Sequence, residues 1–227
     1  ATDGQEINYF DYSDDLATSK KNNIYLGTVS RVEPSLQAAF IEFGSEKKAF
    51  LPFDEIHPSY FKIPHNEKIL VKDNDKNSDI DDEKENKKHF LSFYRKYKIQ
   101  DVIKKDQVLL VQIVKEERGT KGAAITTFIS LPGRYSVLLP NNSSTGGVSK
   151  KISNPLDRKR LKKLHDNFSL PEGMSLIIRT NAISAEDDDI IADFSYLRKL
   201  WTKIREDTLK SKAPVLITEL DTPIIKV

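Results

Sequence analysis

Two phenylalanines, Phe40 and Phe50, lie in neighbouring runs of β-forming residues and could offer stacking surfaces to nucleic-acid bases. A turn-like segment, 44–46, separates the two runs, so antiparallel pairing would bring the rings close together on one face of a sheet. Exposed rings beside Lys or Arg stack on bases while the cations neutralise phosphates. The alternative is that both rings belong to the core, because aromatic strand residues are usually half buried.

A second candidate is the pair Arg179 and Thr180, at the end of an expected strand. A planar guanidinium gives two directed donors to a terminal phosphate, and the hydroxyl adds a third. Gly133, in the turn 132–134, would let a ligand approach the main chain closely, although it is equally compatible with an ordinary hairpin turn. These residues therefore allow a phosphate-binding site without requiring one.

No catalytic residue is expected from the pattern of titratable side chains. The chain has four histidines, His57, His65, His89 and His165. They fall in different expected elements, and none has a Ser, Cys or carboxylate partner at a catalytic spacing. The alternating Asp and Asn residues of 73–81 resemble a calcium loop, but Ser78 replaces its turn glycine and Lys84 its closing glutamate, which argues against calcium.

The elements that must position these residues are mostly strands, which predicts an α+β, β-rich fold. The expected strands are Ile24 to Val32, Leu36 to Phe43, Lys48 to Phe53, Val108 to Val114, Ala123 to Leu131, Tyr135 to Leu139 and Ser175 to Thr180. The rhythm of the first three suits a small barrel. Residues 66–89 are polar, charged and aperiodic, so we expect a mobile insertion that loops out of the barrel.

Two helices are expected in the carboxyl-terminal part of the chain. Asn154 and Pro155 provide a cap and a first-turn proline for the first helix. Ser184 and Asp187 form a capping-box-like start for the second, which runs to about Lys210. One face of the first helix carries Arg158, Lys159, Arg160, Lys162 and Lys163, which could follow a phosphate backbone or simply be solvated. The second should bury Ile190, Ile191, Phe194, Leu197, Trp201 and Ile204.

Composition is that expected of a soluble, cytoplasmic protein. The 227 residues are 38% hydrophobic and 31% charged and include no cysteine, which excludes disulfide and thiolate–metal chemistry. Net charge is +2, yet between Tyr94 and Thr180 there are 17 Lys and Arg against 7 Asp and Glu, so either a polyanion binds here or the lysines are solvated. No apolar run approaches the ~20 residues that span a bilayer, and no signal-peptide layout is present.

Several sequence words resemble the amino-terminal half of the bacterial RNase E/G family of endoribonucleases. They are, in order, EPSLQAAFIEFG, VKEERGTKGAAITTFISLPGRYSVLLP, GGVSK and LPEGMSLIIRT. The resemblance covers most of the chain. It implies a five-stranded OB-fold barrel of S1 type over 21–127, an α/β 5′-sensor subdomain over 128–212, and the edges of an RNase H-like subdomain at 1–20 and 213–227.

The resemblance also assigns roles to individual residues. Those that grip single-stranded RNA near the point of scission are Phe40, Phe50 and Lys121. Those that form a pocket for the 5′-monophosphate of RNA are Gly133, Val137, Arg179 and Thr180. Phe43 stands where some members carry Tyr, so its ring is expected to keep a stacking role.

We therefore predict the RNA-binding and 5′-monophosphate-sensing portion of an RNase E/G-type endoribonuclease that acts on single-stranded RNA in mRNA decay and rRNA and tRNA processing. By resemblance, the catalytic Mg²⁺ and a structural Zn belong to a domain expected after Val227, so this chain should hold no cofactor and be inactive alone. The family's tetramer should also require those later domains. The competing hypothesis is a stand-alone, non-catalytic module that binds single-stranded RNA.

Overall fold

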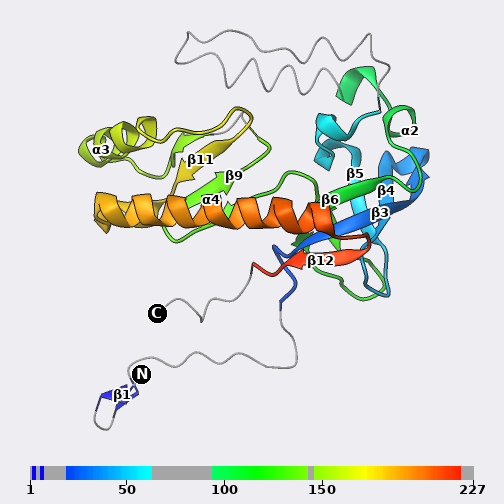
Figure 1. Cartoon of the computed structure of the whole chain (residues 1–227), viewed down its shortest axis with the longest axis horizontal. Helices are drawn as coiled ribbons and strands as arrows, with labels where there is room; N and C mark the ends of the chain where they lie inside the picture. The colour runs from blue at the N-terminus through cyan, green and yellow to red at the C-terminus, as the bar shows by residue number, and fades with distance from the viewer. Residues whose placement is uncertain (1, 4–5, 8–18, 63–93, 143–145, 221–227) are drawn as a thin grey trace.

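The computed structural model describes residues 2–3, 6–7, 19–62, 94–142 and 146–220. Within these residues the chain folds as a mixed α+β protein, with a five-stranded barrel beside a second sheet that is flanked by helices (Figure 1). This confirms the predicted α+β class and barrel. The insertion predicted at 66–89 lies outside the described residues.

The barrel closes because its first strand pairs with its fourth as well as its second. Its strands are β3 (Ile24–Glu33), β4 (Ala38–Glu42), β5 (Ala49–Pro52), β6 (Val108–Lys115) and β7 (Ala124–Thr126). Neighbours follow the order β3-β4-β5-β7-β6, and β6 returns to β3. The β5–β7 pairing is parallel and the others are antiparallel.

Core and surface positions alternate along the barrel strands. Ala39 and Ile41 on β4 and Leu51 on β5 are fully buried, whereas Phe40 and Phe50 lie half-buried on the opposite face. A slip of one residue would exchange the two faces. Since burial of a Leu or Ile side chain stabilises the fold by roughly 1.5–3 kcal/mol, the apolar positions hold this register.

Short helices connect the barrel strands. They are the 3₁₀ turns η1 (Pro34–Leu36), η2 (Phe53–Glu55) and η3 (Pro58–Tyr60) and the helix α2 (Ile99–Val102). The strand predicted to begin at Leu36 begins instead at Ala38. Pro34 starts the η1 turn, and Gln37 closes it in the left-handed region at φ 45°, so the extended conformation cannot begin earlier.

The strand predicted for Ala123 to Leu131 is divided between two sheets. Here β7 ends at Thr126, and β8 (Leu131–Pro132) belongs to the second sheet. After β7, the Thr127 amide donates to the Glu55 carbonyl (2.9 Å). This partner lies in the η2 turn and not on a strand, so the chain leaves the barrel at this point.

The second sheet carries the carboxyl-terminal candidate residues. Its strands are β8, β9 (Ser136–Leu139), β10 (Gly147–Val148) and β11 (Ser175–Ile178), in the order β10-β11-β9-β8. The chain leaves β11 at Arg179 and enters the 3₁₀ helix η5 (Thr180–Ser184). Arg179 and Thr180 therefore lie at the end of a strand, as predicted, although the strand itself stops at Ile178.

Two helices, α3 (Pro155–Asp166) and α4 (Asp187–Lys210), flank this sheet. The Asn154 cap of α3 is confirmed, since its Oδ1 accepts from the Leu156 amide (2.9 Å). The capping box predicted for α4 is wrong. Glu186 occupies the N-cap without a side-chain hydrogen bond, because Ser184 is still part of η5.

The buried stripe of α4 is nearly as predicted. Ile190, Phe194, Leu197 and Ile204 are buried. Trp201 is half-buried, and Ile191 is 41% exposed because it follows Ile190 by only one position, about 100° around the helix. The long helix runs from the second sheet to the barrel (Figure 1).

A shared hydrophobic cluster joins the barrel to the second sheet. It combines Ile24 and Leu110 from the barrel strands with Leu138 from β9 and Leu197 from α4. β12 (Val215–Thr218) extends this region by pairing antiparallel with the start of β3. Its assignment to a separate subdomain stays a prediction, as does that of the short strands β1 (Thr2–Asp3) and β2 (Glu6–Ile7). Among the described residues, no helix is long and apolar enough to cross a membrane.

Candidate nucleic-acid interface

Phe40 and Phe50 form an aromatic platform on the outer face of the barrel. The two residues are direct register partners on β4 and β5, and their ring centroids lie 5.9 Å apart at an interplanar angle of 67°. Both side chains are half-buried, so each keeps surface that a base can contact. The predicted closeness of the two rings is confirmed.

Arg31 extends the platform on its β3 side. It pairs with Phe40 in the sheet, and its guanidinium carbon lies 4.9 Å from the centroid of the Phe40 ring. Sequence reasoning missed this residue because strict alternation from the buried Val29 would point Arg31 inward. The irregularity between Val29 and Arg31 inserts one residue and turns Arg31 outward.

Lys121 lies in a turn held against the other side of the platform. The turn is closed by the bridge between Arg118 and Lys121, and Phe50 donates its amide to the Ala123 carbonyl (2.7 Å). Gly122 allows this approach, since a Cβ there would lie 2.0 Å from the Lys48 carbonyl oxygen. The exposed Lys121 is therefore fixed beside the strand that carries Phe50.

Phe43 does not belong to this surface, and its predicted stacking role is wrong. It is 1% exposed and makes an edge-on contact with Tyr25 inside the barrel, with ring centroids 5.0 Å apart. Phe43 follows Phe40 by an odd number of positions, which places it on the opposite face of the sheet.

Arg179 and Gly133 come together at one end of the second sheet. Arg179 Nη1 donates to the Gly133 carbonyl (2.7 Å), and the Arg179 amide donates to the Tyr135 carbonyl (2.8 Å). Thr180 follows directly and is exposed, while Val137 lies half-buried on the neighbouring strand β9. Within the described part of the chain, the guanidinium donates to Gly133 alone, so its other donors are available to a ligand.

Asp193 of α4 fixes the turn that presents the Gly133 carbonyl. Its carboxylate accepts from the amides of Arg134 (2.9 Å), Tyr135 (3.1 Å) and Ser136 (2.9 Å), and from the Ser136 hydroxyl (2.8 Å). A Cβ at Gly133 would lie 2.5 Å from Asp193 Oδ2, so glycine is needed for this contact. Successive amides around one anion make a rigid nest.

Nothing in the sequence marked Asp193. It lies on a long helix between exposed and buried positions, where a carboxylate is ordinarily solvated. Its partners come about 58 residues earlier in the chain. Only the tertiary packing of α4 against the second sheet reveals that it supports the turn at Gly133.

The basic face of α3 is only partly free to bind a phosphate backbone. Arg160 donates to the carbonyls of Ala182 (3.0 Å) and Ile183 (3.0 Å) and pairs with Asp187 (2.7 Å), so it holds the η5 segment that begins at Thr180. Arg158 donates to the carbonyl of Ser149. The remaining members of the face, Lys159, Lys162 and Lys163, are exposed.

His57 and Tyr94 are among the titratable groups near the barrel whose pKa values are shifted. Burial lowers the pKa of His57 to about 4, so its ring is neutral near neutral pH and adds no charge to the surface. Burial, with a smaller contribution from Asp54 and Glu55, raises the pKa of Tyr94. No group of three or more His, Asp or Glu side chains that could hold a metal ion occurs among the described residues.

Comparison with known proteins identifies the family. Residues 130–227 match the model of the Ribonuclease E/G family. The chain is 39% identical over 224 residues to Ribonuclease E of Buchnera aphidicola subsp. Schizaphis graminum and 38% identical over 224 residues to Ribonuclease E of Escherichia coli K12. The chain belongs to the ribonuclease E/G family. The resemblance seen in the sequence is thereby confirmed.

The matches cover nearly all of this chain but a small part of each relative. The two Ribonuclease E alignments include 99% of the chain and 20% and 19% of the relatives, respectively. Ribonuclease G of Salmonella typhimurium is 38% identical over 184 residues, which is 81% of the chain and 32% of that protein. The chain thus spans about a fifth to a third of the length of these ribonuclease E/G relatives.

Proposed function

We propose that this chain binds single-stranded RNA and recognises its 5′-monophosphate end, as the RNA-positioning portion of a ribonuclease E/G-type endoribonuclease. The observation that carries the proposal is the geometry of Arg179. One guanidinium nitrogen is anchored on the Gly133 carbonyl, and the exposed Thr180 hydroxyl is adjacent in the chain. This arrangement orients the free donors, which suit the oxygens of a terminal phosphate.

The barrel supports the RNA-binding half of the proposal. A closed five-stranded barrel in the order β3-β4-β5-β7-β6 is the arrangement expected of an OB-fold, a common binder of oligonucleotides. The Phe40 and Phe50 rings lie on its outer surface, with Arg31 over one of them and Lys121 on the adjoining turn. Rings and cations in this combination bind single strands with little sequence preference.

The two sites would act together by positioning one strand. The pocket holds the 5′ end, and the barrel holds bases farther along, so the RNA is presented in a limited set of geometries. Bond breaking would then fall to a metal-dependent domain outside this chain, where Mg²⁺ would polarise the scissile phosphate. We propose likewise that the cofactor and the oligomeric state of the whole enzyme depend on that domain.

The proposal is tested by the binding of one short single-stranded RNA with either a 5′-monophosphate or a 5′-hydroxyl, at fixed salt. Charge-assisted hydrogen bonds of about 1.5 kcal/mol predict a preference of roughly tenfold for the monophosphate. Arg179→Ala should remove that preference. The control is Arg205→Ala, which removes an equal charge from the exposed face of α4 and should leave it intact.

Two outcomes would revise the proposal. If the unaltered chain binds 5′-monophosphate and 5′-hydroxyl RNA equally well, it is a general binder of single-stranded RNA. That result would favour the stand-alone RNA-binding module. A preference that survives Arg179→Ala would place the end-recognition site elsewhere. In either case binding through Phe40 and Phe50 could persist, because these residues lie on the barrel and not on the second sheet.

A further inference from the structure

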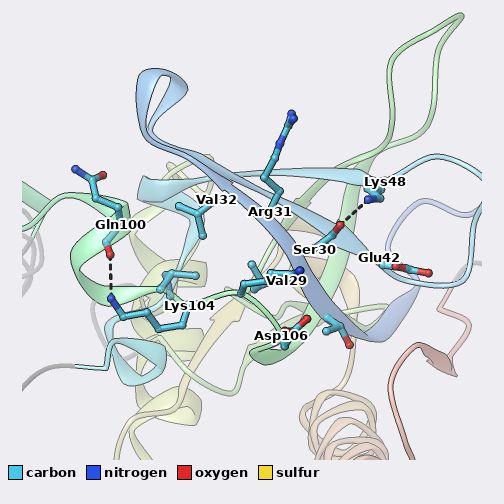
Figure 2. A pocket seen from close by; sticks show the side chains of 12 residues that line it. Val29, Ser30, Arg31, Val32, Glu42, Lys48, Gln100, Lys104 and Asp106 are labelled. Atoms are coloured by element: carbon cyan, nitrogen blue, oxygen red, sulfur yellow. Dashed lines mark hydrogen bonds between the residues drawn. The ribbon is translucent and has the colours of Figure 1, made fainter.

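A groove of about 740 Å³ lies on the barrel surface between β3 and the turn 103–106 (Figure 2). Its lining includes four cationic side chains, Arg31, Lys48, Lys104 and Lys105. Two acids, Glu42 and Asp106, also line it, so the groove carries an excess of positive charge. No role was expected for it from the sequence.

The groove continues directly from the aromatic platform. Arg31 lines the groove and also covers the Phe40 ring. Glu42, another lining residue, follows Phe40 by two positions on β4 and therefore lies on the same outer face, about 7 Å along the strand. Lys48, which also lines the groove, lies directly before β5 and two positions before Phe50. The groove and the platform are thus one continuous surface.

The cations of the groove are held on both of its sides. Lys48 Nζ donates to Ser30 Oγ (2.5 Å) on one side, and Lys104 Nζ donates to the Gln100 carbonyl (3.2 Å) on the other. Figure 2 shows these two lysines toward opposite ends of the groove, with Val29 between them. Lys105 is exposed beside Lys104. This spread of separate charges suits an extended polyanion better than one compact anion.

We propose that this groove binds the sugar–phosphate backbone of the RNA strand whose bases stack on Phe40 and Phe50. The inference rests on the proposed RNA-binding role of the barrel and extends it to a second, electrostatic segment. Arg31 is the junction, because it contacts the ring of the platform and lines the groove. The length of RNA that the barrel covers is therefore greater than the platform alone provides.

The test compares RNAs of about four and about twelve nucleotides, lengths within the range of OB-fold site sizes. Both RNAs carry a 5′-hydroxyl, so that recognition of a 5′-phosphate plays no part. Lys104→Gln combined with Lys105→Gln should weaken binding of the longer RNA about tenfold. It should also lower the slope of log affinity against log salt by about 1.4, or 0.7 for each phosphate contact. Binding of the short RNA, which the platform alone accommodates, should change less than about twofold.

The matched control is Lys199→Gln combined with Lys203→Gln, which removes the same charge from exposed positions of α4. The groove proposal would be overturned if the control variant lost as much affinity for RNA, or if the groove variant lost equal affinity for both RNA lengths. Either result would mean that the lysines act only by general electrostatic attraction. An unchanged affinity of the longer RNA would overturn the groove proposal as well. Phe40→Ala separates the two proposals: if it too leaves binding unchanged, RNA binding by the barrel fails, whereas loss with Phe40→Ala alone overturns only the groove.

Discussion

The aromatic platform and the Arg179 turn, by which we mean residues 133–136 together with the Arg179 side chain held against them, present different kinds of groups to a ligand. The platform consists of side chains, Phe40 and Phe50, whose positions follow from the register of two regular strands. The Arg179 turn depends on main-chain groups, since the Gly133 carbonyl orients the guanidinium and three amides bind Asp193. The first suits base stacking, and the second suits the recognition of a phosphate end.

This difference predicts different responses to mutation. A side chain of the platform can be removed while the strands keep their register, because its neighbours on the other face supply the barrel core. The Arg179 turn is held instead by hydrogen bonds to one carboxylate, that of Asp193. Removal of Asp193 would leave three amides of one turn without their acceptor. Substitutions should therefore separate the two surfaces by which RNA contacts they weaken and by how much they destabilise the fold.

The largest effect is expected from Gly122→Ala, at the turn beside the platform. The new Cβ would lie 2.0 Å from the Lys48 carbonyl oxygen, and a main-chain atom cannot move aside easily. The free energy of unfolding, measured in urea, should fall by about 3 kcal/mol. Lys121→Ala is the control, because it removes the exposed cation but leaves the turn. Equal stability of the two variants would contradict this account of the turn.

The next largest effect is expected from Asp193→Ala. Loss of a half-buried acceptor that serves four donors should lower the free energy of unfolding by about 2 kcal/mol. RNA binding should lose its preference for a 5′-monophosphate while 5′-hydroxyl RNA binds as before. The exposed Glu206→Ala on the same helix should change neither quantity. Weaker binding of both RNAs by the folded Asp193→Ala variant would show that the turn serves the platform too.

Phe50→Ala should act on binding and spare end recognition. Loss of stacking should weaken binding by about 1.5 kcal/mol for RNA with either 5′ end, as measured by fluorescence anisotropy. Tyr196→Ala removes another exposed ring, on α4, and should have no effect on binding. A loss confined to 5′-monophosphate RNA would remove the distinction between the two surfaces.

The smallest expected effect is a loss of stability at acidic pH, caused by the burial of His57 beside the barrel. Burial lowers the pKa of His57 from 6.5 to about 4, so the unfolded chain takes up the proton first and stability falls as the pH drops below about 6.5. Between pH 7 and about pH 5.5 this should cost about 1 kcal/mol. Unfolding in urea at the two pH values should show a smaller difference for His57→Gln. An identical difference would mean that His57 does not titrate as its burial implies.

How well the sequence predicted each surface depends on how far apart in the chain the residues of that surface lie. The Phe40–Phe50 pair was found from two adjacent β-runs and a short turn, because a period of two assigns their faces locally. The same rule, applied to Phe43, would have placed that ring in the core. Alternation did not predict the outward position of Arg31, because an irregularity in β3 moves its side chain to the other face of the sheet. No residue type marks that irregularity in the sequence.

The Arg179 turn was only half predictable. Arg179 and Thr180 were predicted from their phosphate-binding chemistry at the end of a strand and Gly133 from its turn, and the family resemblance assigned all three to one pocket. The structure brings Arg179 against Gly133. Asp193 could not be found, because it joins a helix to a turn far away in the chain. Arg160 was misread for the same reason, since its acceptors are carbonyls of the distant η5 segment.

The most direct test of the central claim is a double-mutant cycle of Phe50→Ala and Arg179→Ala. Affinity would be measured for one RNA with a 5′-monophosphate and the same RNA with a 5′-hydroxyl. The account predicts that Phe50→Ala weakens both RNAs equally and that Arg179→Ala weakens only the first. On 5′-monophosphate RNA the two losses should add within about 0.5 kcal/mol. Loss of the monophosphate preference in Phe50→Ala, or weaker 5′-hydroxyl binding in Arg179→Ala, would contradict the claim that the two surfaces recognise different parts of the RNA.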